Sequence, residues 1–127
     1  MGHIGYTPQF KKKFKVEGNT NSKAQKLLKE ALMIEKAGAF SIVLECVAPK
    51  ASKMITNSLN IPTIGIGSSN NCDGQILVTD DLLGLSGFYP KFVKKYASLT
   101  RTIEKAVKKY TRDVKQNKFP AKKNILK

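Results

Sequence analysis

The chain has 127 residues, and its net charge of +14 comes from 23 basic residues set against 9 acidic ones. A chain of this length forms one domain and is too short for a complete (β/α)8 barrel, which takes about 250 residues. With 41% hydrophobic and 25% charged residues, the composition is that of a globular protein and excludes disorder over most of the chain.

The positive charge is concentrated near the C-terminus. Residues 91–127 carry thirteen basic residues against two acidic ones, whereas residues 37–90 carry a net charge of −2. A basic segment of this kind is compatible with nucleic acid or an anionic membrane surface. However, 21 of the 23 basic residues are Lys, and proteins that recognise bases and phosphates rely on the planar fork of Arg. Solvated surface lysines are therefore the favoured interpretation, and a basic nucleic-acid-binding module stays an alternative.

The cysteines and the apolar segments indicate a cytoplasmic protein. Cys46 and Cys72 are the only two cysteines, too few for a disulfide framework or a zinc site. The N-terminus lacks the basic and apolar regions of a signal peptide. The best apolar stretch, residues 37–47, is too short to span a bilayer. We therefore expect no membrane contact.

In chain order, the first clear element is an amphipathic helix over residues 21–36. Its apolar side chains recur at helical spacing, with Lys side chains on the opposite face. One of residues 20–22 is expected to cap its start, and Gly38 stands where a helix-ending glycine is typical. Before it, Phe10 to Lys15 is a basic connector with interleaved Phe.

Strand and helix patterns then alternate. Residues 40–46 form a nearly continuous apolar run, which predicts a buried parallel strand. Pro49 opens a helix that extends to about residue 59. Further strands are predicted over 62–66 and 75–78, and a first strand ends at Gly5. This βα alternation is typical of a parallel sheet, so the predicted fold class is α/β.

One or two helices are predicted over residues 91–117. We expect a single domain over 1–127, with a mobile tail over 118–127. Six apolar side chains of the predicted helical region are spaced for burial: Phe92, Tyr96, Ile103, Val107, Tyr110 and Val114.

Glu45 is the most informative residue for chemistry. It lies near the C-terminal end of an apolar strand, where a buried carboxylate is costly unless it is paired or has a task. Catalytic residues of barrel enzymes sit at the C-terminal ends of strands, and apolar surroundings suit a carboxylate that acts as a general base. A strand-end Glu that only reaches solvent or pairs with Lys is an equally good interpretation of the sequence alone.

Three other groups of residues carry weaker signals. His3 is the only histidine, and the glycines beside it suggest close backbone approach. The Gly-, Ser- and Asn-rich segment 65–71 looks like an anion-holding loop, but it matches neither known phosphate-binding motif, so a strand-to-helix connection is favoured. Asp80 and Asp81 are adjacent carboxylates for which helix capping is favoured over metal binding.

Several motifs together resemble the ketopantoate hydroxymethyltransferase family. They stand in the family's order and spacing over nearly the whole chain, and they cover the C-terminal half of the family's sequence. The motifs are Met1–Gln9, Lys15–Val16, Glu35–Ala39, Ile42–Val47, Ile61–Gly67, Cys72–Gln75, Leu83–Leu85 and Pro90–Val93.

The resemblance implies a fold, a reaction and two site residues. The family is a (β/α)8 barrel that uses Mg²⁺ and 5,10-methylenetetrahydrofolate to transfer a hydroxymethyl group to 2-oxoisovalerate, giving ketopantoate for pantothenate biosynthesis. Glu45 matches the family's proton acceptor, and His3 matches its active-site His, which we expect to bind substrate. The chain would be the C-terminal four βα units of a partial (β/α)8 barrel with parallel strands.

The resemblance also has gaps. The family's metal ligands and its substrate-holding Ser and Lys belong to the N-terminal half, so this chain has no residue to assign as a metal ligand. Asp80 stands where the family has His, and Ser68 and Ser69 replace an Ala-Gly pair. The C-terminal Glu-His-Ser-Phe of the family is replaced by residues 123–126.

A half barrel leaves open sheet edges, and open edges invite pairing. We therefore expect self-association or a complex with a separate N-terminal half, besides the small-molecule 2-oxo acid and folate. The alternative is a truncated, inactive remnant or one half of a split enzyme.

Overall fold

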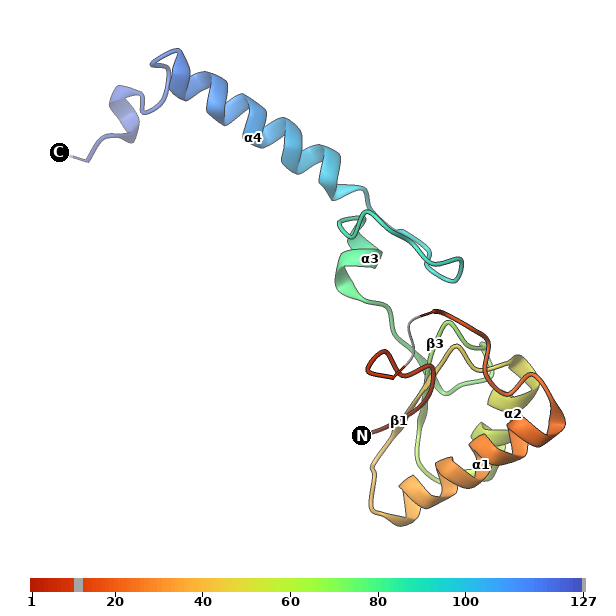
Figure 1. Cartoon of the computed structure of the whole chain (residues 1–127). Coiled ribbons are helices and arrows are strands. Elements are labelled where there is room, and N and C mark those ends of the chain that lie inside the picture. Colours follow the sequence, from red (N-terminus) through yellow and green to blue (C-terminus); the bar gives the residue numbers. More distant parts are fainter. Residues whose placement is uncertain (11–12, 127) are drawn as a thin grey trace. The chain divides into compact units, whose positions relative to one another are not determined.

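The structure, a computed structural model, describes residues 1–10 and 13–126 (Figure 1). The chain divides into two compact units, one formed by Met1–Leu77 with Pro90–Val93 and the other by Val78–Tyr89 with Lys94–Lys127. The expected single domain and the expected mobile tail over 118–127 stay predictions. Lys11 and Lys12 of the basic connector, and Lys127 of the tail, lie outside the described residues.

The first unit is a parallel sheet with two connecting helices, which confirms the predicted α/β class. The strands lie in the order β1-β2-β3-β4, and each neighbouring pair is parallel. This arrangement is consistent with part of a (β/α)8 barrel. The elements are β1 (Gly2–Gly5), α1 (Asn21–Lys36), β2 (Ile42–Glu45), α2 (Pro49–Ser58), β3 (Thr63–Ile66) and β4 (Gly74–Gln75).

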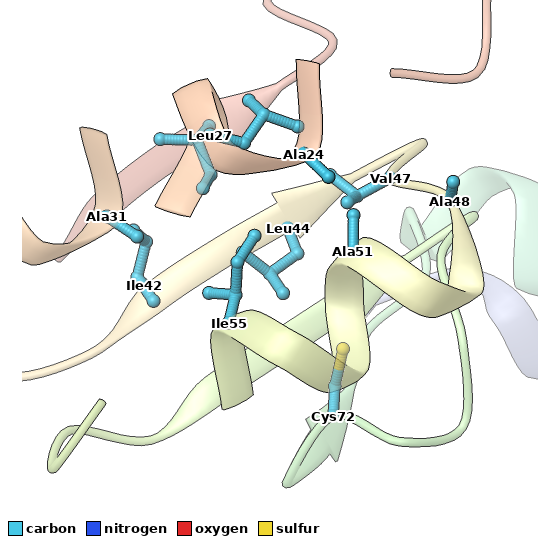
Figure 2. Close-up of a cluster of buried hydrophobic side chains, with 11 residues drawn as sticks. Ala24, Leu27, Ala31, Ile42, Leu44, Val47, Ala48, Ala51, Ile55 and Cys72 are labelled. Carbon is cyan, nitrogen blue, oxygen red and sulfur yellow. The ribbon is translucent and has the colours of Figure 1, made fainter. Parts of the chain in front are cut away.

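The core lies between the helices and one face of this sheet. Because side chains alternate between the two faces of a strand, Ile42 and Leu44 of β2 point to the same side. Figure 2 shows both facing Ala31 and Leu27 of α1 and Ile55 of α2. Ile42, Leu44 and Ile55 are fully buried, and burying a side chain of this size contributes about 1.5–3 kcal/mol. The alternate residues of β2, Val43 and Glu45, therefore place their side chains on the opposite face of the sheet.

The ends of α1 follow the sequence signals. The Thr20 hydroxyl oxygen accepts a hydrogen bond from the Lys23 N–H at 3.3 Å, which makes Thr20 the cap. After the helix, Gly38 takes a φ of +91° and its N–H donates to the Glu35 carbonyl at 2.9 Å. A left-handed glycine closes the helix end in this way because other residues are strained there.

The predicted strand over 75–78 is wrong in its bounds. β4 contains only Gly74 and Gln75, and the side chains of Ile76 and Val78 are exposed. Among the described residues, β4 is an edge strand with no further strand beside it. The Ile76 N–H still donates to the Gly65 carbonyl at 3.0 Å, but β3 ends at Ile66, so residues 77 and 78 have no strand partner in the described chain.

The second unit contains α3 (Thr79–Leu83), α4 (Leu99–Lys115) and a short 3-10 helix (Lys122–Asn124). The predicted helical region therefore begins at residue 99 rather than 91. Of the six residues expected to be buried, Phe92 is half-buried, but the other five are 41–66% exposed, so that part of the prediction is wrong. The helical spacing of those apolar residues that lie in α4 correctly predicts that they share one face of this helix. Spacing within a helix does not determine whether another element packs on that face, and these side chains are exposed.

Candidate functional site

His3 and Glu45 meet on the face of the sheet opposite the helices. In the parallel β1-β2 ladder, His3 is paired with Val43 and Gly5 with Glu45. Paired side chains point to the same face, and residues two apart do so as well, so His3 and Glu45 share a face. The His3 Nε2 atom lies 3.0 Å from the Glu45 Oε2 atom. The structure thus brings together the two site residues that the sequence predicts.

Glu45 is the last residue of β2, as the pattern predicts. Its side chain is 14% exposed and that of His3 is 34% exposed, so solvent or a small molecule can reach both. With the imidazole N–H donating to Oε2, the carboxylate is held by one oxygen. The second oxygen, Oε1, then remains to accept a proton.

Gly5 allows β1 to approach the backbone of Glu45. The Tyr6 N–H donates to the Glu45 carbonyl at 2.8 Å, and Gly5 has a φ of +95°. A Cβ on Gly5 would lie 2.2 Å from the Glu45 carbonyl oxygen, far inside van der Waals contact. The close approach that the glycines beside His3 suggest is therefore present at Gly5.

Cys46 follows Glu45 in an unusual conformation that the sequence analysis missed. Its φ is +54°, in the left-handed region that residues with a Cβ seldom adopt. The thiol is buried, and burial together with the negative charges of Glu45 and Glu17 raises the pKa of Cys46. A thiol of raised pKa is a poor nucleophile, so Cys46 has a structural role beside the carboxylate.

The loop after β3 uses its hydroxyls inside the protein. The Ser68 Oγ atom donates to the Leu44 carbonyl at 2.6 Å and accepts from the Val47 N–H at 2.9 Å. The Ser69 Oγ atom accepts from the Asn71 N–H at 2.9 Å. These contacts support the interpretation of the segment as a connection rather than an anion site, but the prediction that it leads to a helix is wrong, because β4 follows it. No sequence pattern marked Ser68 as a contact of β2.

Asp73 ties the end of this loop to the start of β3. Its Oδ2 atom accepts from the Thr63 N–H at 2.8 Å and from the Thr63 hydroxyl at 2.9 Å. These hydrogen bonds stabilise the carboxylate and lower the pKa of Asp73. The neighbouring Cys72 is buried, and burial raises the pKa of its thiol. Asp73 and Cys72 therefore hold the loop between β3 and β4 in place, and neither is a candidate for proton transfer.

Asp80 and Asp81 do not cap a helix, so that prediction is wrong. α3 begins at Thr79 with Val78 in the capping position, which places both carboxylates in its first turn. Negative charge there is favourable because it faces the positive end of the helix dipole. Within the described part of the chain, no three His, Cys, Asp or Glu side chains are grouped to hold a metal ion.

A cavity of about 330 Å³ lies beside β1 and α1. Its lining includes His3 and Thr7 together with Lys23, Lys26 and Glu30 of α1. This volume matches a small-molecule site, but Glu45 is not part of the lining. Of the two candidate site residues, only His3 therefore lines this cavity, and the Glu45 carboxylate lies outside it.

Comparison with known proteins places these residues in a family. A family model described as ketopantoate hydroxymethyltransferase matches residues 1–122. The chain is 52% identical to the 3-methyl-2-oxobutanoate hydroxymethyltransferase of Clostridioides difficile (strain 630), over 98% of this chain and 46% of that protein. It is 51% identical to the protein of the same name from Pseudothermotoga lettingae, over 100% of this chain and 49% of that protein.

The chain thus spans about half the length of the curated relatives it matches. A third example, from Clostridium botulinum (strain 657 / Type Ba4), is 50% identical over the full chain and 48% of the relative. Separately, no helix among the described residues has the length and apolar character needed to cross a membrane.

Proposed function

The chain belongs to the ketopantoate hydroxymethyltransferase family, and on that premise we propose that it supplies the proton-abstracting half of a hydroxymethyltransferase active site. The reaction would transfer a hydroxymethyl group from 5,10-methylenetetrahydrofolate to 2-oxoisovalerate, giving ketopantoate. The observation that carries the proposal is the 3.0 Å contact of His3 with Glu45 at the end of a parallel strand.

Glu45 acts as the general base in this proposal. The bond between hydrogen and the carbon next to the carbonyl breaks, the proton passes to Glu45 Oε1, and the electron pair remains as an enolate. The enolate carbon would then form a bond to the one-carbon unit of the folate, both bonds from that unit to the folate nitrogens would break, and water would provide the hydroxyl oxygen. Tetrahydrofolate would leave, its two nitrogens taking up the proton removed from the substrate and one proton from water. The donated hydrogen bond from His3 holds Oε2, which leaves Oε1 to accept the proton. His3 is itself 34% exposed, which supports its role in binding the 2-oxo acid.

The residues of this chain do not fit a Mg²⁺ site. No cluster of three metal-binding side chains occurs among the described residues, and Glu45 already pairs with His3. The metal that the resemblance implies would need ligands from outside this chain. We therefore infer that a separate N-terminal half, or another chain that supplies equivalent ligands, completes the site. The free, buried cysteines support a cytoplasmic location for such an assembly.

The test is exchange of the substrate proton in a reconstituted complex. This chain is mixed with the half of the Clostridioides difficile relative that it does not match, and 2-oxoisovalerate is added in D₂O with Mg²⁺. Proton NMR then follows loss of the signal from the carbon next to the carbonyl. Glu45→Gln removes the base, and we expect exchange to fall by at least about 10²-fold, the range of general-base contributions.

Glu104→Gln is the matched control, because Glu104 is an exposed carboxylate on α4, outside both the His3–Glu45 pair and the cavity lining. It should leave exchange within about twofold of the unmodified chain. Exchange that survives Glu45→Gln would remove Glu45 as the base. Absence of exchange from the complex with the unmodified chain would favour the second candidate, an inactive remnant, which the missing metal ligands already support.

A further inference from the structure

We propose that Ser68 is a positioning residue that holds the Glu45 carboxylate against His3. The proposal rests on the proposed function, in which Glu45 is the base. Ser68 does not touch the carboxylate. Its hydroxyl instead joins the backbone on both sides of Glu45, at Leu44 O (2.6 Å) and Val47 N (2.9 Å).

The first reason is that the sheet ladder ends at this point. The Cys46 N–H donates to the Ile66 carbonyl at 2.9 Å, the last ladder bond between β2 and β3. Gly67 then turns away with a φ of +61°, and the N–H of Val47, the residue after Cys46, donates to the Ser68 Oγ atom at 2.9 Å rather than to a carbonyl of the sheet. Val47 is 1% exposed, and a buried N–H without a partner is costly. The Ser68 Oγ atom is the acceptor that satisfies this N–H.

The second reason is the conformation of Cys46, which lies between the two anchor points. Its φ of +54° is one that residues with a Cβ adopt only where the surroundings impose it. The Glu45 and Cys46 carbonyls accept from Tyr6 N–H and Glu17 N–H, each at 2.8 Å. Both of these donors are backbone groups that substitution leaves in place. Ser68 is a side-chain constraint on the same turn, and it can be removed.

The consequence concerns the direction in which Glu45 points. The carboxylate reaches His3 only while the backbone at the end of β2 keeps its orientation, and a misplacement of about 1 Å costs a reaction up to about 10²-fold. Without the hydroxyl, the turn at Cys46 is free to relax, and the Glu45–His3 contact lengthens. In the family resemblance an Ala stands at position 68, so this constraint is a feature of the present chain.

The test uses the free chain and needs no turnover. The sequence contains one His, so the ring signals of His3 are the only imidazole signals in a carbon–proton NMR spectrum. At a fixed pH of about 8, Glu45→Gln gives the ring shifts of His3 without its carboxylate partner. Ser68→Ala is expected to move the His3 signals at least a third of the way from the unmodified position to this reference. Hydrogen exchange of the Val47 amide should become at least about tenfold faster, because its acceptor is gone.

Two variants make the result specific. Ser69→Ala is the matched control, since it removes a hydroxyl from the same loop but leaves the Leu44 and Val47 contacts in place, and His3 should not move. Ser68→Thr retains the hydroxyl and should restore the His3 signals. If Ser68→Ala does not fold, Ser68→Cys provides the same comparison, because a thiol is a weak donor and acceptor.

A folded Ser68→Ala chain whose His3 signals stay in place would overturn the proposal. Movement equal to that in Ser69→Ala would also overturn it, because the effect would then belong to the loop as a whole. In the reconstituted complex, Ser68→Ala should lower the rate constant of proton exchange about tenfold with KM within about twofold. Failure of the transferase activity would leave the His3 measurement interpretable, so the two proposals can fail separately.

Discussion

At the scale of single residues, Asp73 is a carboxylate outside the candidate site whose hydrogen bonds favour its charged form. Its two hydrogen bonds from Thr63 exist only while Oδ2 accepts, and they lower the pKa of Asp73 from its ordinary value of 3.8. A carboxyl group with a lowered pKa in the folded state stabilises the fold above its ordinary pKa. That contribution is lost as the pH falls through the folded-state value.

We therefore predict that Asp73→Asn makes the chain less sensitive to acid. The unmodified chain should lose urea resistance between about pH 5 and pH 3, where carboxyl groups titrate, and Asp73→Asn should lose less because its side chain does not titrate. At neutral pH the variant is less stable than the unmodified chain, and the two curves converge in acid. Urea midpoints measured by circular dichroism at several pH values report this.

Glu104→Gln is the control for that measurement. It removes one exposed carboxylate from α4 and leaves the Thr63 contacts intact. Its acid dependence should follow that of the unmodified chain. Equal acid sensitivity in the Asp73→Asn variant and the unmodified chain would show that the Thr63 contacts do not carry the effect.

At the scale of elements, the pairing of β1 with β2 depends on Gly5. The Gly5 position combines two constraints, a φ of +95° and a backbone oxygen that a Cβ would approach to 2.2 Å. Gly38, after α1, has a similar φ of +91° but no atom within 4 Å of the added Cβ. Comparing substitutions at Gly5 and Gly38 therefore distinguishes the cost of backbone strain from the cost of a clash between β1 and β2.

We predict that Gly38→Ala lowers the free energy of unfolding by about 1 kcal/mol, the strain of one residue in the left-handed region. Gly5→Ala adds the clash with the Glu45 carbonyl, so it should cost more than about 3 kcal/mol or prevent folding. Urea unfolding of both variants measures the difference. Equal losses in the free energy of unfolding for Gly5→Ala and Gly38→Ala would mean that β1 shifts away from the added methyl group without penalty. The pairing of β1 with β2 at Glu45 would then be less constrained than the structure indicates.

The same contrast between local and long-range constraints explains what the sequence predicts. α1, its cap at Thr20 and the position of Glu45 at the end of β2 follow from patterns within a few residues. The short β4, the φ of Cys46 and the Ser68 contacts depend on residues distant in sequence or on a strand that is absent beside β4. Composition and periodicity do not encode such partners. The roles of Glu45 and His3 came from the family motifs, whereas their 3.0 Å contact required the strand register.

At the scale of the whole molecule, each of the two compact units exposes apolar side chains. Ile103, Val107 and Tyr110 on α4 are 49–57% exposed, and Ile76 and Val78 after β4 are 45% and 53% exposed. Apolar side chains exposed in this way, within each unit taken by itself, typically mark an interaction site. The chain also spans about half the length of its relatives, and the half of the relatives that it does not match is the partner that we propose for the open edges of the sheet.

We predict that the half of the relatives that this chain does not match stabilises the chain by binding to its folded state. A partner that binds only the folded state at 100 times its Kd adds about 2.7 kcal/mol, which raises the Tm of a chain of this size by about 10 °C or more. The measurement is thermal unfolding of this chain with increasing amounts of the unmatched half of the Clostridioides difficile relative. The matched half of that relative, which corresponds to this chain itself, is the control and tests self-association. A rise in Tm with the unmatched half alone supports a split enzyme. An equal rise in Tm with the unmatched half and with the matched half supports non-specific association or self-association. No rise in Tm with either half would contradict the proposed assembly.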